Sequence, residues 1–228
     1  MKKGLDAPLV PLLLISFGLV ALVAALSSHE LINLIFPLIL LVSGGLYLYT
    51  SLVGKYKIIV RVVSQMDLQP NAQVLDLGTG HGAFLMEIAK KLKAPGKVTG
   101  IDIWNQNDQL NNALANTQQL IDAQDLTGVS QLTTANMTDL PFNDETFNFV
   151  VASVAIHNVK PASARAKAIS EAYRVLKPGG EIIIIDIEHI AQYQRTLQQL
   201  GVSELTVSNA GINGMYGIMM TRILRARK

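Results

Sequence analysis

Val74-Leu75-Asp76-Leu77-Gly78-Thr79-Gly80-His81-Gly82 is the stretch around which the rest of the chain is organised. Its apolar start predicts a short buried strand, and the apolar residues at helical spacing after Gly82 predict an amphipathic helix. Glycine at every second position of the intervening turn leaves no Cβ there, so a ligand can approach the backbone closely. The free N–H groups at the start of a helix suit an anionic group. The loop alone also fits a relaxed dinucleotide-binding pattern.

Strand and helix patterns alternate after this loop, which predicts a mostly parallel sheet with helices on both faces. We expect strands near 73–77, 97–102, 130–134, 146–153 and 181–187, and helices at about 82–93, 108–124, 161–176 and 189–200. The tail could supply two further strands, at 204–209 and 216–226.

Several further motifs follow the glycine loop in a fixed order. Asp76 lies inside the first strand and Asp102 ends the second. Downstream come Asn136-Met137-Thr138-Asp139-Leu140-Pro141-Phe142, then Thr146-Phe147-Asn148-Phe149-Val150-Val151-Ala152-Ser153, then Arg174-Val175-Leu176-Lys177-Pro178-Gly179-Gly180-Glu181. This series resembles the class I S-adenosylmethionine (SAM)-dependent methyltransferases, in particular the branch that contains the ubiquinone/menaquinone-biosynthesis and small-molecule methyltransferases. The agreement of several motifs in order is more specific than any one of them.

The resemblance implies a fold and a cofactor site. The fold is Rossmann-like and doubly wound: a mostly parallel seven-stranded sheet whose last strand is antiparallel. The glycines would pass under the methionine part of SAM, Asp76 would hold its ammonium group, and Asp102 would accept hydrogen bonds from the ribose hydroxyls. Asn136 stands where the family usually has aspartate, and its amide oxygen could still accept from the adenine amino group. The implied cofactor-binding residues are Asp76, Gly78, Thr79, Gly80, Gly82, Asp102, Ile103, Asn136, Met137 and Ser153.

The site for the methyl acceptor leaves fewer traces in the sequence. Methyl transfer needs aligned reactants, and a general base only if the acceptor must lose a proton. His157, just past the end of a strand, is the candidate base, and a structural or substrate-packing role is the alternative. The chain has no cysteine and its four histidines are scattered, so no metal site is predicted. A net charge of +2 gives no reason to expect a nucleic-acid partner.

The N-terminal part of the chain is unusually apolar. Residues 8–26 and 31–53 contain no charged side chain, and each run approaches the roughly 20 residues that cross a bilayer as a helix. The short connection between them lacks Lys and Arg, whereas Lys2, Lys3, Lys55, Lys57 and Arg61 flank the pair on its outer ends. The positive-inside rule then predicts a multi-pass anchor in the cell membrane, with both chain termini and the catalytic domain in the cytoplasm.

Three regions are therefore expected: a transmembrane helical hairpin (1–53), a basic amphipathic connector (54–72) and a methyltransferase domain (73–228). A cleaved signal peptide is the competing interpretation of residues 1–26, but the apolar run exceeds the usual signal core of about 7–15 residues. The connector could lie on the membrane surface or form the first helix packed on the catalytic sheet.

The sequence thus predicts a membrane-anchored SAM-dependent methyltransferase whose acceptor is small and lipophilic or membrane-associated. Anchoring would raise the local concentration of such an acceptor. An NAD(P)-dependent oxidoreductase and a SAM-binding membrane scaffold without catalysis remain as alternatives. The oligomeric state is not predicted.

Overall fold

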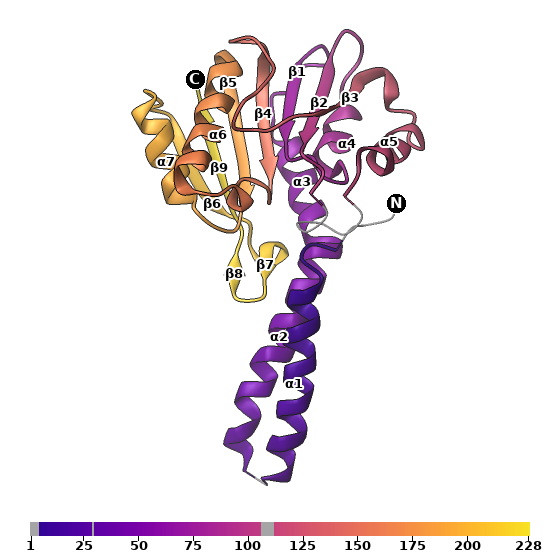
Figure 1. Cartoon of the computed structure of the whole chain (residues 1–228), viewed down its shortest axis with the longest axis vertical. Helices are drawn as coiled ribbons and strands as arrows, with labels where there is room; N and C mark the ends of the chain where they lie inside the picture. Colours follow the sequence, from indigo (N-terminus) through magenta and orange to yellow (C-terminus); the bar gives the residue numbers. More distant parts are fainter. Residues whose placement is uncertain (1–4, 29, 106–111) are drawn as a thin grey trace.

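The computed structural model describes residues 5–28, 30–105 and 112–228. A head built on a β-sheet sits on a two-helix stalk, and the described part of the chain begins near the junction of the two (Figure 1). The stalk consists of α1 (Leu9–Ser27) and, after the 3-10 turn η1 (Leu31–Leu34), α2 (Ile35–Tyr49). The described residues do not include Lys2, Lys3, His29 or the first residues of the helix expected from 108.

The head contains the predicted seven-stranded sheet, in the order β3-β2-β1-β4-β5-β9-β6. All neighbouring pairs are parallel except those of β9, which runs antiparallel between β5 and β6. The strands are β1 (Gln73–Leu77), β2 (Lys97–Asp102), β3 (Ser130–Thr134), β4 (Phe147–Ser153), β5 (Leu176–Asp186), β6 (Leu205–Asn209) and β9 (Arg222–Arg227). The fold class expected from the sequence is therefore confirmed.

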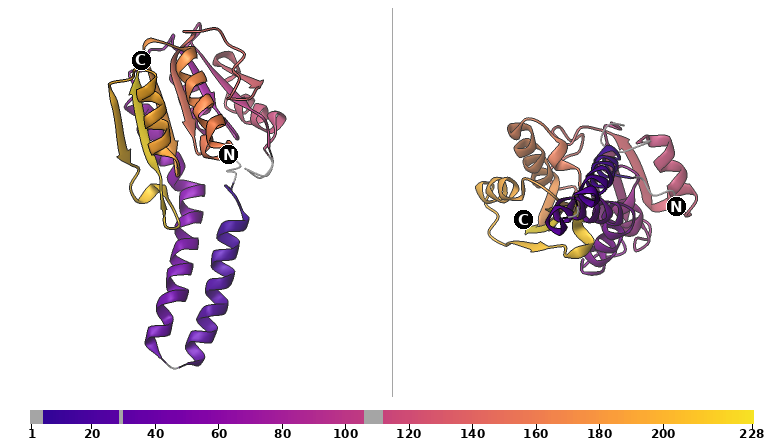
Figure 2. Two further views of the ribbon diagram at one scale, coloured as in Figure 1. Left: turned by 60° about the vertical axis from the view of Figure 1, so that its left-hand side comes forward. Right: turned by 90° about the horizontal axis from the view of Figure 1, so that it is seen from below.

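Helices cover both faces of this sheet, as the two views in Figure 2 make clear. One face carries α3, α4 and α5, and the other carries α6 and α7. These helices are α3 (Lys55–Ser64), α4 (Ala83–Ala89), α5 (Leu114–Asp122), α6 (Ala162–Val175) and α7 (Ile190–Gln199). Alternate residues along a strand point to opposite faces. Val74 therefore packs in the core under α3, α4 and α5, and Leu75 packs in the core under α6 and α7.

Several element boundaries differ from the sequence prediction. The helix expected at about 82–93 ends at Ala89, and the strand expected at 216–226 begins only at Arg222. Among the described residues, the helix expected at about 108–124 begins at Leu114, and Ala113 before it is extended, with φ −152° and ψ 140°. The strand expected from 181 begins at Leu176, directly after α6. Residues 177–180 form an irregularity within that strand, between the pairs Phe147–Leu176 and Phe149–Glu181.

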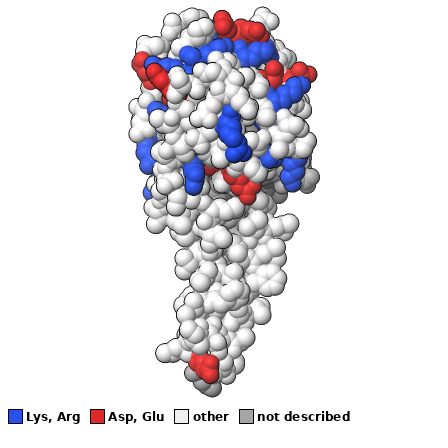
Figure 3. All heavy atoms as spheres, turned by 90° about the vertical axis from the view of Figure 1, so that its left-hand side faces the viewer, with Lys and Arg blue, Asp and Glu red and all other residues white. Residues whose placement is uncertain are grey.

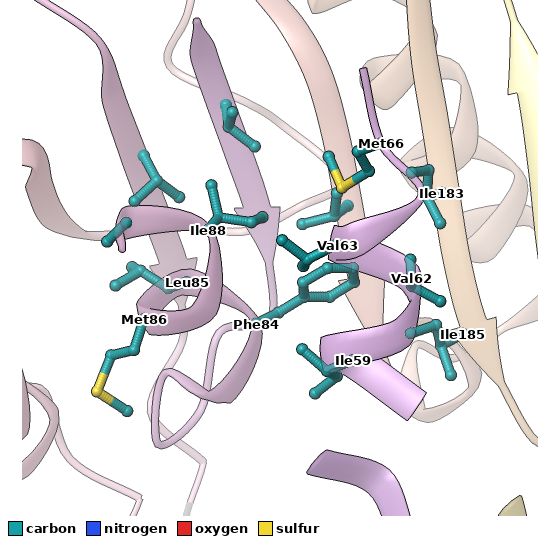
Figure 4. Packing of buried hydrophobic residues seen from close by; sticks show 14 of the residues in the cluster. Ile59, Val62, Val63, Met66, Phe84, Leu85, Met86, Ile88, Ile183 and Ile185 are labelled. Atoms are coloured by element: carbon teal, nitrogen blue, oxygen red, sulfur yellow. The ribbon is translucent and has the colours of Figure 1, made fainter. Parts of the chain in front are cut away.

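Residues 54–72, expected as a connector, are largely part of the head. The apolar side of α3 packs against α4 and the sheet, with Ile59, Val62 and Val63 beside Phe84 (Figure 4). The helical interpretation of this segment is therefore correct, and its apolar side faces protein.

The stalk helices show the opposite pattern of exposure. The structure contains two helical stretches, Leu9–Ser27 and Leu31–Ser64, that are long and apolar enough to cross a membrane by length and composition. Only 17 % of the most apolar window of each is buried within the molecule, unlike the core helix of a soluble domain. The visible surface of the stalk lacks charged side chains except at its far tip, whereas the head carries both signs (Figure 3).

Helix α3 provides a test of the packing. Ile58 is 2 % exposed and its neighbour Val60 is 49 % exposed. We expect Ile58→Ala to lower the free energy of unfolding by about 2–5 kcal/mol, because it leaves a cavity in the core. Val60→Ala, the matched control, should change it by less than about 0.5 kcal/mol. Denaturant unfolding of the detergent-solubilised protein, followed by fluorescence of the single tryptophan, Trp104, measures both. Equal losses would contradict the assigned burial.

Candidate active site

A cavity of about 640 Å³ lies at the carboxyl ends of the central parallel strands. It opens beside β1, from which the chain first adds β2 and β3 on one side of the sheet and then β4 and β5 on the other. Open α/β sheets bind their ligands at such a switch point. Ten of the eleven site residues predicted from the sequence line it: Asp76, Gly78, Thr79, Gly80, Asp102, Ile103, Asn136, Met137, Ser153 and His157.

The glycine loop adopts a backbone that side chains would not tolerate. Gly78, Gly80 and Gly82 have φ angles of +66°, +49° and +74°, in the left-handed region that favours glycine. A Cβ on Gly78 would also lie 2.5 Å from the Cβ of Ala155. Gly82 does not line the cavity. Its role is local, because it directly precedes α4 and a Cβ there would meet the Thr117 side chain at 3.2 Å.

Asp76 lies at the floor of the cavity and is almost fully buried. One carboxylate oxygen, Oδ2, accepts hydrogen bonds from the Thr79 hydroxyl (2.8 Å) and the Leu85 backbone N–H (3.2 Å). Burial raises the pKa of this carboxyl to about 7, against the opposing effect of these two bonds. A cationic ligand group would relieve the cost of burying the charge, which fits the ammonium group of SAM.

Asp102 ends β2 and is held by the backbone on both of its oxygens. Oδ2 accepts from the Gly80 N–H (2.9 Å), and Oδ1 accepts from the Trp104 N–H (2.6 Å). Oδ1 also accepts from the Asn112 side-chain amide at 3.3 Å, whereas Oδ2 keeps a second lone pair for a hydroxyl of the ribose. Acceptance by Oδ1 from the neighbouring hydroxyl would replace the longer Asn112 bond. Ile103, 60 % exposed, lies on the cavity wall beside it. The Trp104 side chain does not line the cavity: its indole N–H donates to the Thr134 hydroxyl instead (2.9 Å).

The segment expected to contact adenine has a more local geometry than predicted. The Asn136 side-chain oxygen accepts from both the N–H and the hydroxyl of Thr138, each at 3.0 Å. These bonds occupy both lone pairs, so acceptance from an adenine amino group would require one of them to open. Met137 lines the cavity close to Gly78, with its methyl 3.3 Å from where a Gly78 Cβ would stand. The adenine contacts of both residues stay predictions.

His157 is part of a buried hydrogen-bond network that sequence reasoning missed. Its Nδ1 lies 2.6 Å from Oδ1 of Asp186, the fully buried last residue of β5. Oδ2 of Asp186 accepts from the His157 backbone N–H (3.1 Å) and the Tyr193 hydroxyl (3.2 Å). The carboxylate favours a proton on Nδ1, which leaves the lone pair on Nε2. His157 can therefore act as an oriented base on the cavity wall.

The cavity extends from the cofactor residues to the root of the stalk. Asp6, which precedes α1, forms an ion pair with Lys55 at 2.8 Å, and these side chains are only 16 % and 9 % exposed. The Ser51 and Tyr216 hydroxyls also donate to Asp6, at 3.1 and 2.8 Å. Asp6, Lys55 and Tyr216 all line the cavity, opposite the glycine loop. No sequence motif marks this cluster, because its members are up to 210 positions apart.

The fold and these contacts define a methyltransferase-type cofactor site, and comparison with known proteins agrees. Residues 75–184 match the family described as "Methyltransferase domain". This match and the fold support a class I SAM-dependent methyltransferase with S-adenosyl-L-methionine as its cofactor, and the donors and acceptors described above fit that molecule. In such a site the cofactor supplies an electrophilic methyl group.

Individual relatives are similar over the same region. The chain is 34 % identical to demethylmenaquinone methyltransferase of Lactiplantibacillus plantarum over 126 residues, which is 55 % of this chain and 49 % of that protein. It is 32 % identical to the ubiquinone/menaquinone biosynthesis C-methyltransferase UbiE of Geotalea daltonii over 124 residues, 54 % of this chain and 49 % of the relative. The chain thus spans about half the length of the curated relatives it matches.

Among solved structures, a SAM-dependent methyltransferase from Aquifex aeolicus superposes with a TM-score of 0.58. The superposed region covers 75 % of this chain and 89 % of the Aquifex aeolicus chain, at 19 % sequence identity. This likeness supports the fold.

Asp102 provides a test of the cofactor site. Asp102→Ala removes two charge-assisted acceptors, each worth about 1.5–3 kcal/mol, so we expect S-adenosylhomocysteine to bind at least about 100-fold more weakly. Isothermal titration of the detergent-solubilised protein measures this. Asp139→Ala, an exposed acid outside the cavity lining, is the control. Unchanged affinity in Asp102→Ala would reject the assigned ribose contact.

Asp76 makes a second prediction, on pH dependence. Between about pH 4, where an unfolded aspartate ionises, and about pH 7, the folded protein holds a proton that the unfolded chain has released. The free energy of unfolding should therefore fall as pH rises through this window. Asp76→Asn should remove the part of this fall that is due to Asp76, because the amide keeps a hydrogen-bond acceptor but does not ionise. Unfolding curves of the ligand-free protein at a series of pH values measure the difference, and parallel pH profiles would contradict the raised pKa.

Proposed function

We propose that this protein is a membrane-anchored SAM-dependent methyltransferase that methylates a lipophilic acceptor of the quinone class on carbon. The observation that carries the proposal is the shared cavity, which has the cofactor residues on one side and the root of the apolar stalk on the other. The names of the matching relatives, which describe menaquinone and ubiquinone methylation, support the acceptor class.

Two arguments support the stalk as a membrane anchor that stays on the chain. Its exposed surface is made of large apolar side chains, among them Leu19, Val20 and Phe36, each more than 50 % exposed. Such a surface is unfavourable in water and favourable in lipid. Cleavage after the first apolar run would also remove Asp6, the partner of the largely buried Lys55, and a buried charge without its partner is strongly destabilising.

The chemistry suggested for the site follows from its own residues. A hydroquinone ring is a carbon nucleophile once a hydroxyl has lost its proton, and His157 would take that proton on Nε2. The ring carbon would then take the methyl group from SAM, leaving S-adenosylhomocysteine. Its hydrogen would leave as a proton and the oxygen would regain one, which restores the aromatic hydroquinone with net release of one proton. The Asp186 carboxylate would accept a hydrogen bond from Nδ1 of His157, which orients the imidazole ring and stabilises the imidazolium that forms. Tyr193, whose pKa is raised chiefly by burial, would keep its proton and continue to donate to Asp186.

Two variants and one control test the role of His157 as the base. His157→Ala should lower kcat by about 10²–10⁴-fold, with binding of S-adenosylhomocysteine unchanged. Asp186→Asn should lower kcat less and change the pH profile, because it acts through the imidazole. His189→Ala, an exposed histidine outside the cavity lining, is the control. Transfer of labelled methyl from SAM to a demethylated naphthohydroquinone measures all three. A wild-type rate in His157→Ala would reject the base.

The proposed orientation can be tested by labelling, because the chain has no native cysteine. Ser28→Cys, in the connection between the two apolar runs, should react with a membrane-impermeant maleimide in intact cells. Gly128→Cys, in the head where added side-chain atoms meet nothing within 4 Å, should react only after the cells are permeabilised. The reverse pattern would contradict a cytoplasmic catalytic domain.

A further inference from the structure

A small hairpin near the end of the chain has an unusual composition. The twelve residues 210–221 carry no charge, although Arg222 follows them directly. They form the 3-10 turn η5 (Ile212–Gly214) and the short antiparallel strands β7 (Met215–Tyr216) and β8 (Met219–Met220). Ile212, Ile218 and Met220 are 68 %, 84 % and 42 % exposed. Three large apolar side chains thus project from a segment inserted between β6 and β9.

This hairpin descends from the head along the upper part of the stalk (Figures 1 and 2). At its turn, a Cβ built on Gly217 would lie 3.6 Å from the Ser43 carbonyl oxygen and 4.0 Å from Leu14. Both contacts lie within the apolar runs. Leu14 is five residues into α1 and Ser43 is six residues before the end of α2. At 1.5 Å per residue, the turn lies about 8–10 Å inside the ends of the stalk helices.

Specific contacts fix the hairpin in this position. The Thr50 hydroxyl donates to the Met215 carbonyl oxygen, and the Tyr49 hydroxyl donates to the side chain of Asn213, both at 2.8 Å. The ring of Tyr216 packs edge-on against that of Tyr47, with centroids 5.0 Å apart. The hairpin is therefore held against the stalk at a fixed depth.

The backbone of the segment also suits a surrounding of low polarity. The strands pair with each other, and the N–H of Thr221 donates to Gly214. The N–H of Gly214 in turn donates to Gly211, and that of Ala210 donates to Thr221. Internal bonds of this kind reduce the cost of placing a turn where water is scarce.

The same hairpin forms part of the cavity wall. Met219 of β8 and Val10 of α1 both line the cavity that holds His157 and Asp102. Val10 is 39 % exposed and lies in the first turn of α1, so the cavity borders the end of the stalk nearest the head. A molecule lying among the acyl chains could therefore reach the cavity without passing through water.

We propose that the β7–β8 hairpin inserts its turn into the cytoplasmic leaflet beside the stalk, and that the lipid-like acceptor enters between this hairpin and the first turn of α1. The inference rests on the proposed membrane anchor and deepens it. It assigns the exposed side chain of Ile218 to the acyl chains of the bilayer and assigns Met219 and Val10 to the entrance.

Depth measurement by spin labelling tests the insertion in the full chain, again because it has no native cysteine. Nitroxides at Ile218→Cys, at Phe36→Cys in α2 and at Gly128→Cys in the head are compared in phosphatidylcholine–phosphatidylglycerol vesicles. Collision with oxygen reports lipid, and collision with a water-soluble nickel chelate reports water. We expect Ile218→Cys to behave like Phe36→Cys, with a several-fold higher ratio of oxygen to nickel collisions than Gly128→Cys.

Each other outcome has a separate meaning. A water-exposed Ile218→Cys beside a lipid-exposed Phe36→Cys would overturn the insertion and leave the anchor intact. A water-exposed Phe36→Cys would overturn the anchor itself, and with it the insertion. Low collision with both reagents at Ile218→Cys would indicate a covering protein surface and would also overturn the proposal.

The entrance is tested by activity. Ile218→Lys places a charge on the inserted turn without touching the cavity lining. We expect KM for a polyprenyl-substituted naphthohydroquinone in vesicles to rise at least about fivefold, with kcat/KM for the tail-free ring unchanged. Ile218→Leu, the apolar control, should keep the wild-type KM for the long-tailed acceptor. Equal effects on both acceptors, or none on the long-tailed one, would overturn entry beside the hairpin.

Discussion

One continuous helical run, Leu31–Ser64, connects the stalk to the core of the catalytic head. Its outer part exposes apolar side chains, and its last ten residues, α3, bury theirs against the sheet. Between the two lies a π-helical turn, η2 (Thr50–Gly54), whose Thr50 and Ser51 hydroxyls donate to Met215 and Asp6. Because one helix serves both parts, the position of the head relative to the stalk is set by the backbone itself.

The ion pair at the root adds a second constraint. A buried charge pair gains little unless its remaining hydrogen-bonding capacity is satisfied. Asp6 meets that condition, since it accepts from Lys55, Ser51 and Tyr216. These three donors come from α3, from the π-turn and from the β7–β8 hairpin, so a single carboxylate ties the start of α1 to three elements. The wall of the cavity on the stalk side depends on this arrangement.

Sequence reasoning predicted the features that follow from local patterns. The strand and helix order and the loop glycines rest on periodicity or on motifs a few residues long, and the antiparallel last strand was implied by the family resemblance. Most of the predicted cofactor residues line the cavity for the same reason. Gly82 is the exception, because it lies outside the cavity lining and is needed for the start of α4.

The features that could not be predicted depend on contacts between distant residues. Asp186 is one more residue in a run of isoleucines until the ends of β4 and β5 lie side by side and bring it to His157. An aspartate at the carboxyl end of a buried strand was the available signal, since such a residue is exposed to the crevice or must be paired. The links from Asp6 to Lys55 and Tyr216 carry no such signal, because they require the stalk to be docked on the head.

The stiff joint between α2 and α3 has a consequence for how the enzyme would meet its acceptor. A domain on a flexible tether samples many heights and tilts, and most of them are unproductive. With the stalk in a bilayer, as proposed, the head would keep one face toward the lipid at all times, and the search would be reduced to lateral diffusion in a plane. Encounter would then depend on the mole fraction of acceptor in the leaflet and on membrane fluidity, and very little on the volume of the surrounding solution.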